Sequence, residues 1–227
     1  MEILKFLGVN LEEKPSLDFI QEEKSVDIPD GSLCELLVTS VELPKGSKSP
    51  KEGLVVNFLV YGLANSETKF ITYENGNVKF PNGKKGLYVN HRVTPDLFSR
   101  MNYIIRVNNT SHSVKLPDDY ETYDDAKAAK FFLAVLSYRF GLDRYIAKGM
   151  IIPAFVYTNS RGFKDVSIYD RINRTYIPTP VPYRFLGGTQ EEAERITDEI
   201  VSAYMTNGRT NGDASGIDES LKKMLGY

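Results

Sequence analysis

The hydrophobic period of this chain changes twice, and that change limits the folds open to it. Strand-like runs separated by turn-forming residues occupy 33–43, 54–62, 68–80 and 87–93. A helical spacing of apolar residues then replaces the alternation, starting from a capping-box-like Thr122 and Asp125 and ending at Gly141. Strand character returns over 150–170. This order predicts a mainly β chain with one internal helix.

Turn residues predict three hairpins within this order. Asn75-Gly76 lies between alternating residues, which is the strongest short signal for a two-residue turn. Residues 102–107 and 112–116 form a second pair of short strands, and 150–170 form a third hairpin that turns at 159–162. Pro153 predicts that the first strand of this last hairpin lies at an edge or carries a bulge.

Several strands, one helix and two more strands follow the order of an OB-fold, a Greek-key barrel with its helix between strands three and four. The expected fold class is therefore β-rich α+β: an OB-fold-like barrel followed by a C-terminal helix. Residues 74–120 exceed a minimal barrel and predict an elaborated hairpin insertion. The sequence leaves open whether this insertion lines a binding groove or covers it.

The chain divides by composition into four parts. Residues 1–30 are an acidic lead-in, 31–188 form the OB-like domain, 189–205 an acidic helix with Thr189 as N-cap, and 206–227 a flexible tail with a short amphipathic end. Within the domain, residues 44–53 are rich in Lys, Gly, Ser and Pro and predict a basic, flexible loop.

Charge is also sorted along the chain, although the formal net charge is only -2. Residues 45–115 hold 11 Lys and Arg against 4 Asp and Glu, whereas residues 1–30 hold 3 against 8 and residues 189–227 hold 4 against 8. A basic centre between acidic ends is typical of a surface that binds a polyanion. An uneven surface without such a ligand would give the same pattern.

Several function classes find little support. The lone Cys34 fits a reducing compartment, and neither a signal peptide nor a membrane-spanning run is present, so a cytoplasmic protein is expected. His91 and His112 are expected to be surface strand residues rather than zinc ligands. Acidic residues at Asp118, Asp119, Glu121, Asp124 and Asp125 could hold magnesium, but their place before a helix favours capping. No nucleotide-binding or nucleophile motif occurs, so we expect no enzyme, cofactor or metal.

Cations interleaved with aromatic rings are the chemistry that the sequence does supply. Single-stranded nucleic acid is bound by cations along its phosphates and by rings on which bases stack. Phe163, in a basic turn where burial is difficult, is the best stacking candidate, whereas Phe70, Phe80 and Phe155 are expected in the core. The candidate nucleic-acid-binding residues are Lys69, Tyr73, Lys79, Lys84, Lys85, Tyr88, Arg92, Tyr157, Arg161, Phe163, Lys164, Tyr169 and Arg171.

A family resemblance rests on several short segments. They are the acidic lead-in, Pro29-Asp30-Gly31, the Lys/Gly/Ser loop, the apolar second strand, Gly141-Leu142, Ala147-Lys148-Gly149 and the basic hairpin with Val166-Ser167-Ile168-Tyr169. Over residues 28–185 this pattern resembles phage-encoded OB-fold single-stranded DNA-binding proteins. The resemblance implies binding of single-stranded DNA without strong sequence preference, in phage DNA replication, recombination or repair in the host cytoplasm.

The resemblance also implies a C-terminal docking element. Such proteins commonly end in an acidic, flexible tail with hydrophobic residues at its tip, which recruits replication proteins. Here the tail is scarcely acidic, but Ile217, Leu221, Met224 and Leu225 have amphipathic spacing and are expected to bind a protein partner or to pack on their own domain.

Two other functions fit the same sequence. The chain could be a structural or adaptor protein, such as a virion or assembly component, whose basic surface docks an acidic protein partner. It could also be an RNA-binding OB module, since no residue reveals a preference at the 2′-hydroxyl.

Overall fold

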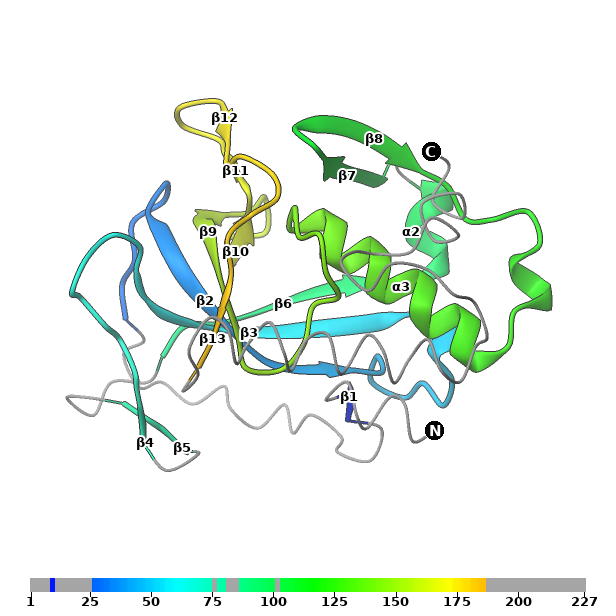
Figure 1. Cartoon of the computed structure of the whole chain (residues 1–227), viewed down its shortest axis with the longest axis horizontal. Helices are drawn as coiled ribbons and strands as arrows, with labels where there is room; N and C mark the ends of the chain where they lie inside the picture. Colours follow the sequence, from blue (N-terminus) through cyan, green and yellow to red (C-terminus); the bar gives the residue numbers. More distant parts are fainter. Residues whose placement is uncertain (1–8, 11–25, 75–76, 81–85, 101–102, 187–227) are drawn as a thin grey trace.

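One curved sheet forms the body of the protein (Figure 1). The computed structural model describes residues 9–10, 26–74, 77–80, 86–100 and 103–186. The body of the sheet is built from antiparallel neighbours in the order β10-β9-β2-β3-β6. These strands are β2 (Leu33–Glu42), β3 (Leu54–Leu63), β6 (Tyr88–Val93), β9 (Met150–Thr158) and β10 (Lys164–Ser167).

The sheet nearly closes into a barrel because β10, at one edge, lies against β6 at the other. Helix α3 (Asp125–Arg139) lies between β6 and β9 in the chain and packs against β3 and β6 (Figure 1). Numbered along the chain, the five strands follow the OB order, with the helix between the third and fourth. The predicted β-rich α+β OB-like barrel is therefore confirmed, and the helix predicted after it, over 189–205, lies outside the described residues.

Short elements decorate this barrel. β1 (Val9–Asn10) pairs in parallel with the end of β2, and β13 (Arg184–Phe185) pairs with the start of β9. Three hairpins stand apart from the main sheet: β4 (Thr72–Glu74) with β5 (Asn77–Lys79), β7 (Tyr103–Val107) with β8 (Thr110–Val114), and β11 (Tyr169–Asp170) with β12 (Thr175–Tyr176). The short helices are η2 (Pro50–Glu52), α2 (Pro95–Arg100) and η4 (Tyr120–Thr122).

The core fills the barrel because the inner faces of its strands are apolar. On β3, Leu54, Val56, Phe58 and Val60 are fully buried at alternate positions. Phe58 packs edge-on against Phe140 at the end of α3, with ring centres 4.8 Å apart. Almost every residue from Ala128 to Tyr138 is buried as well, so α3 closes one end of the barrel.

The start of α3 differs slightly from the prediction. The carboxylate of Asp124 accepts a hydrogen bond from the Lys127 amide at 2.7 Å, so Asp124 is the N-cap. Thr122 belongs instead to the preceding turn of η4. The expectation that acids in this segment cap the helix is confirmed for Asp124, two residues later than the predicted start.

The predicted hairpins are confirmed. Glu74 of β4 pairs with Asn77 of β5, and the β7–β8 turn consists of Asn108 and Asn109, both with positive φ. Asparagine tolerates this left-handed conformation better than most residues. β2 pairs with one side of β9. On the other side, β13 pairs with Met150 and Ile151, and β10 pairs with the residues from Phe155 to Thr158. The stretch around Pro153 is thus a local edge, as its proline predicts.

A second apolar cluster lies on the outer face of the barrel. It consists of Leu37, Leu59, Ile71 and Ile151, with Tyr61, Val78, Phe80 and Leu186 packed around it. Through Ile71, Val78 and Phe80, the segment that carries β4 and β5 covers this part of the barrel. The first part of the predicted insertion therefore covers the outer face of β2 and β3 at this point.

Candidate nucleic-acid interface

The turn between β9 and β10 exposes an aromatic ring beside a cation. The side chain of Asn159 accepts hydrogen bonds from the amides of Arg161 and Phe163 at 3.0 and 3.2 Å, and the Asn159 amide donates to the Phe163 carbonyl at 2.8 Å. These bonds fix the turn, and the Phe163 side chain is left 68% exposed. Arg161 is exposed in the same turn. The predicted turn at 159–162 and the predicted exposure of Phe163 are both confirmed.

Tyr157 lies just before this turn and is held on two sides. Its hydroxyl donates to Asp165 at 2.9 Å, and the Arg171 guanidinium lies 3.7 Å from the centre of its ring. Burial, and then the Asp165 carboxylate, raise the pKa of Tyr157 to about 12, so the phenol remains a donor at neutral pH. Arg171 therefore covers one face of the ring, and its own side chain is exposed to solvent.

Tyr169 is part of a stack that joins two hairpins. Its ring lies 4.6 Å from that of Tyr176 across β11–β12, and the guanidinium of Arg106, from β7, lies 3.9 Å from the centre of the Tyr176 ring. The Asn109 side chain also accepts from the Thr179 amide at 2.8 Å. The half-buried Tyr169 thus has a structural role in this stack that the sequence did not predict.

Lys164 is engaged by a carboxylate of the preceding segment. Its ammonium lies 2.7 Å from Asp30, which also accepts a hydrogen bond from Thr158 at 2.9 Å. The bonds from Lys164 and then Thr158 lower the pKa of Asp30 to about 2. Lys164 therefore fastens the entry to β2 onto the β9–β10 hairpin as well as contributing to the basic turn.

The outer face of β6 carries the second group of predicted residues. Alternation along the strand turns Tyr88, Asn90 and Arg92 outward, and Tyr88 is 59% exposed. The Tyr88 ring lies 6.5 Å from that of Phe80, at the border of the outer cluster. Lys79, on β5, is exposed. One ring and two cations, Tyr88, Arg92 and Lys79, are thus exposed at or near this face.

The same alternation makes the prediction for His91 wrong. His91 shares its face with the buried Val89 and Val93 and points into the barrel. Its Nε2 lies 2.9 Å from the Tyr103 hydroxyl, and its ring packs edge-on against Phe140. Burial, reinforced by the charge of Arg139, lowers its pKa to about 4. His91 is therefore half-buried and packs against the core, rather than lying on the surface.

Two more expectations change. Phe70 packs against the core and Phe80 against the outer cluster, but Phe155 alternates with the fully buried Ala154 and Val156 and so faces outward, half-buried.

The basic loop 44–53 is held in place rather than free. Lys51 donates to the Glu121 carbonyl at 3.0 Å, and its own carbonyl accepts from the Tyr120 hydroxyl at 2.5 Å.

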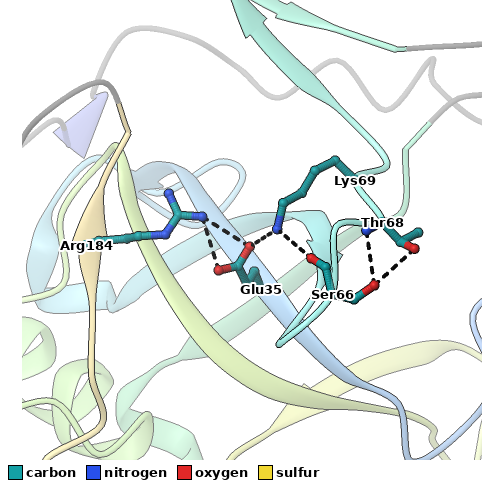
Figure 2. Close-up of polar contacts among 5 residues, drawn as sticks. All are labelled: Glu35, Ser66, Thr68, Lys69 and Arg184. Atoms are coloured by element: carbon teal, nitrogen blue, oxygen red, sulfur yellow. Dashed lines mark hydrogen bonds and ion pairs between the residues drawn. The ribbon is translucent and has the colours of Figure 1, made fainter.

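Lys69 lies apart from both groups, in an ion-pair cluster on the outer face (Figure 2). Its ammonium lies 2.7 Å from Glu35, whose carboxylate also accepts from Arg184 at 3.1 Å with both oxygens. Both cations lie 5.3 Å from the centre of the Tyr61 ring. Sequence reasoning missed this cluster: the strand alternation could have placed Tyr61 outward, but no local signal links Glu35 to Arg184.

The remaining predicted residues lie outside the described side chains. These are Tyr73, Lys84 and Lys85, and in the tail Ile217, Leu221, Met224 and Leu225. Within the described ranges, no group of three His, Cys, Asp or Glu residues is arranged to hold a metal ion. Nor do those ranges contain a helix long and apolar enough to cross a membrane.

The chain was compared with protein-family models, with curated proteins and with solved structures. No family model, no curated protein and no solved structure gives a significant match to the chain.

Proposed function

We propose that this protein binds single-stranded DNA without strong sequence preference and without catalytic activity, in the replication, recombination or repair of phage DNA in the host cytoplasm. The observation that carries the proposal is Phe163: a ring 68% exposed at the tip of the hairpin between the last two barrel strands, next to Arg161. In OB-folds this loop is one of the elements that bind oligonucleotides.

The chemistry of the turn supports a single strand as the ligand. A stacked base would cover the apolar ring of Phe163, a contact worth about 1–3 kcal/mol that every base can make. Arg161, in the turn, and Arg171, over the Tyr157 ring, supply guanidinium groups suited to phosphate. The Arg171 group is already oriented by the Tyr157 ring, 3.7 Å away, so little further ordering is needed when it binds.

The outer face of β6 supports the same ligand. Tyr88 and Arg92 face outward on the third barrel strand, and OB-folds bind oligonucleotides on the face of strands two and three. The segment that carries β4 and β5 covers Leu37 and Leu59 on this face, but Tyr88 and Arg92 remain exposed. The strand would thus contact the barrel through the hairpin turn and through β6.

The test is fluorescence anisotropy of a labelled oligo-dT over a series of salt concentrations. Binding should weaken with salt and resist competition by duplex DNA, and an RNA competitor would measure the preference for DNA. Phe163→Leu, which keeps an apolar side chain but removes the ring, should weaken binding about fivefold to a hundredfold at every salt concentration. Arg161→Gln should lower the salt slope by about 0.7.

Lys148→Gln provides the matched control, because Lys148 is exposed at the opposite end of the barrel, between α3 and β9. It removes the same charge and should change binding little. An affinity indifferent to Phe163→Leu would mean that the turn does not bind the strand. Absence of binding at low salt would overturn the proposal altogether.

One observation favours a second candidate, docking of an acidic protein partner by an adaptor or virion component. Lys69 and Lys164, two of the predicted phosphate contacts, each pair with a carboxylate at 2.7 Å. Such a surface already accommodates carboxylates. A protein that ignores oligo-dT but associates with an acidic partner would fit this candidate. Recruitment of replication proteins by the C-terminal tail stays a prediction under either function.

A further inference from the structure

The ion-pair cluster of Glu35, Lys69 and Arg184 borders a pocket on the outer face of the barrel. The pocket has a volume of about 320 Å³. Glu35, Pro153 and Arg184 belong to its wall, together with Pro182, the aromatic Tyr183 and the turn residues Ala64 and Asn65. This size is at the lower end of the range for small-molecule sites, so the pocket suits one compact group rather than a run of residues.

The pocket exists because β9 has no partner strand along part of one side. β13 pairs with β9 only at Met150 and Ile151, and β10 pairs only from Phe155 onward. Between them, residues 152–154 have no partner strand on this side, and Ile152 and Pro153 line the pocket there. The site is therefore built from the edge of the barrel and the segment that leads into β13.

The charges at its rim leave one positive charge in excess. Glu35 is the only carboxylate that contacts Lys69 and Arg184 in the described chain, so two cations share one anion. Burial by itself would raise the pKa of Glu35, but hydrogen bonds from Lys69 and Arg184 outweigh it and lower the pKa, so the carboxylate stays charged.

Both cations retain donors that can reach another anion. The described bonds of Arg184 to Glu35 use only Nη2, and its side chain is 45% exposed. Lys69 is 33% exposed and lies against Ser66 in addition to Glu35 (Figure 2). A guanidinium has five donors in a planar fork that fits two oxygens of a phosphate. The rim therefore offers an anion site beside apolar and aromatic walls.

The outer face of β9 connects this pocket to the hairpin turn. Pro153, Phe155 and Tyr157 occupy alternate positions on it, and at about 3.3 Å per residue the row is about 13 Å long. Phe155 and Tyr157 are half-buried, and Tyr157 contacts Arg171 at the far end. A ligand that lies along this row would pass from the turn at Phe163 to the pocket.

We propose that the pocket bordered by the Glu35–Arg184 ion pair is a subsite for one nucleotide of the single strand, with its phosphate on Arg184 and Lys69 and its base against the walls formed by Tyr183 and the prolines. This inference rests on the proposed function and adds a second contact region to it. Glu35 holds the two cations in place in the free protein and competes with the phosphate for them.

The competition predicts opposite effects for two variants in the oligo-dT assay. Arg184→Gln removes a phosphate ligand and should weaken binding about fivefold, the order of one exposed ion pair, and lower the salt slope by about 0.7. Glu35→Gln removes the competitor and should strengthen binding about fivefold. A merely structural role of the ion pairs would make both variants bind more weakly.

Glu67→Gln is the matched control for Glu35→Gln. Glu67 is exposed in the same turn as Ser66 and has no ion pair within the described chain, so its loss changes the net charge equally without releasing Lys69 or Arg184. The gain from Glu35→Gln must exceed the gain from Glu67→Gln. Thermal unfolding of each variant verifies that the fold is intact, as expected for exposed ion pairs.

The outcomes separate this inference from the function on which it rests. If the wild type binds oligo-dT, but Arg184→Gln has no effect or Glu35→Gln does no more than Glu67→Gln, the pocket is not a nucleotide subsite and the proposed function stands. If the wild type itself fails to bind at low salt, the function is overturned and the subsite with it.

Discussion

Acid should destabilise this protein through His91, before most carboxylates begin to titrate. The half-buried ring packs against Phe140 and contacts the Tyr103 hydroxyl; the charge of Arg139 disfavours its charged form, and the charge of Asp165 favours it. Burial and the Arg139 charge lower its pKa from 6.5 to about 4. The unfolded chain binds the proton at the ordinary pKa, whereas the folded barrel does not.

The sign and size of the effect follow from this difference. Between pH 6.5 and pH 4 the unfolded state binds more protons, so the free energy of unfolding falls as the pH is lowered through this range. Each unit of pKa difference corresponds to about 1.4 kcal/mol, so the free energy of unfolding falls by about 3 kcal/mol over this pH range. Asp30, whose pKa is lowered from 3.8 to about 2, loses its contribution only below pH 4, so the two effects are separable.

Urea unfolding at pH 7.5 and at pH 4.5, followed by circular dichroism, measures this loss. His91→Gln removes the titrating group, so its stability should change less between the two pH values than that of the wild type, whatever its stability at pH 7.5. Tyr103→Phe is the matched control: it removes the hydroxyl bonded to His91, costs about 1 kcal/mol, and should keep the full pH dependence. A His91→Gln variant with the wild-type dependence on pH would refute the reasoning.

Three further predictions concern the fold. Gly53→Ala should destabilise the protein by more than Gly46→Ala, although both glycines have positive φ. A Cβ at Gly53 would lie 2.2 Å from the Val93 carbonyl oxygen, whereas a Cβ at Gly46 would have nothing within 4 Å. Equal urea midpoints for the two variants would contradict this. Asp124→Ala should cost about 1 kcal/mol in the same assay through loss of the α3 cap, and a change below about 0.3 kcal/mol would argue against that cap. Burial raises the pKa of Cys34 to about 11, so at pH 8 it should react with Ellman's reagent only in urea, and rapid reaction of the folded protein would mean that the thiol is accessible.

The hairpins and the helix could be predicted because their signals are local. Asn75-Gly76 and Asn108-Asn109 can adopt the positive φ that two-residue turns need, and the apolar spacing of residues predicts the helix from Asp125 to Arg139. The order of these elements then sufficed for the OB-like barrel, because few arrangements of such strands around one helix bury all their apolar faces.

Side-chain environment was harder to predict than secondary structure. His91 was expected on the surface because of its polar neighbours, although it alternates with Val89 and Val93 and faces the interior with them. Phe155 was expected in the core because it is apolar, yet its position on β9 turns it outward. In a strand, the parity of a position decides its face, and only the pairing of strands decides which face is buried.

The sequence by itself determined the elements, their order and the exposed ring of Phe163, since each depends on residues within a few positions of one another. Only the tertiary structure decided which charges meet. Glu35 and Arg184 are 149 residues apart and become partners because both β2 and β13 pair with β9. The pocket beside them arises in the same way, where one stretch of β9 is left without a neighbour. Such contacts depend on the register between strands distant in sequence, which closure of the barrel fixes and no local pattern specifies.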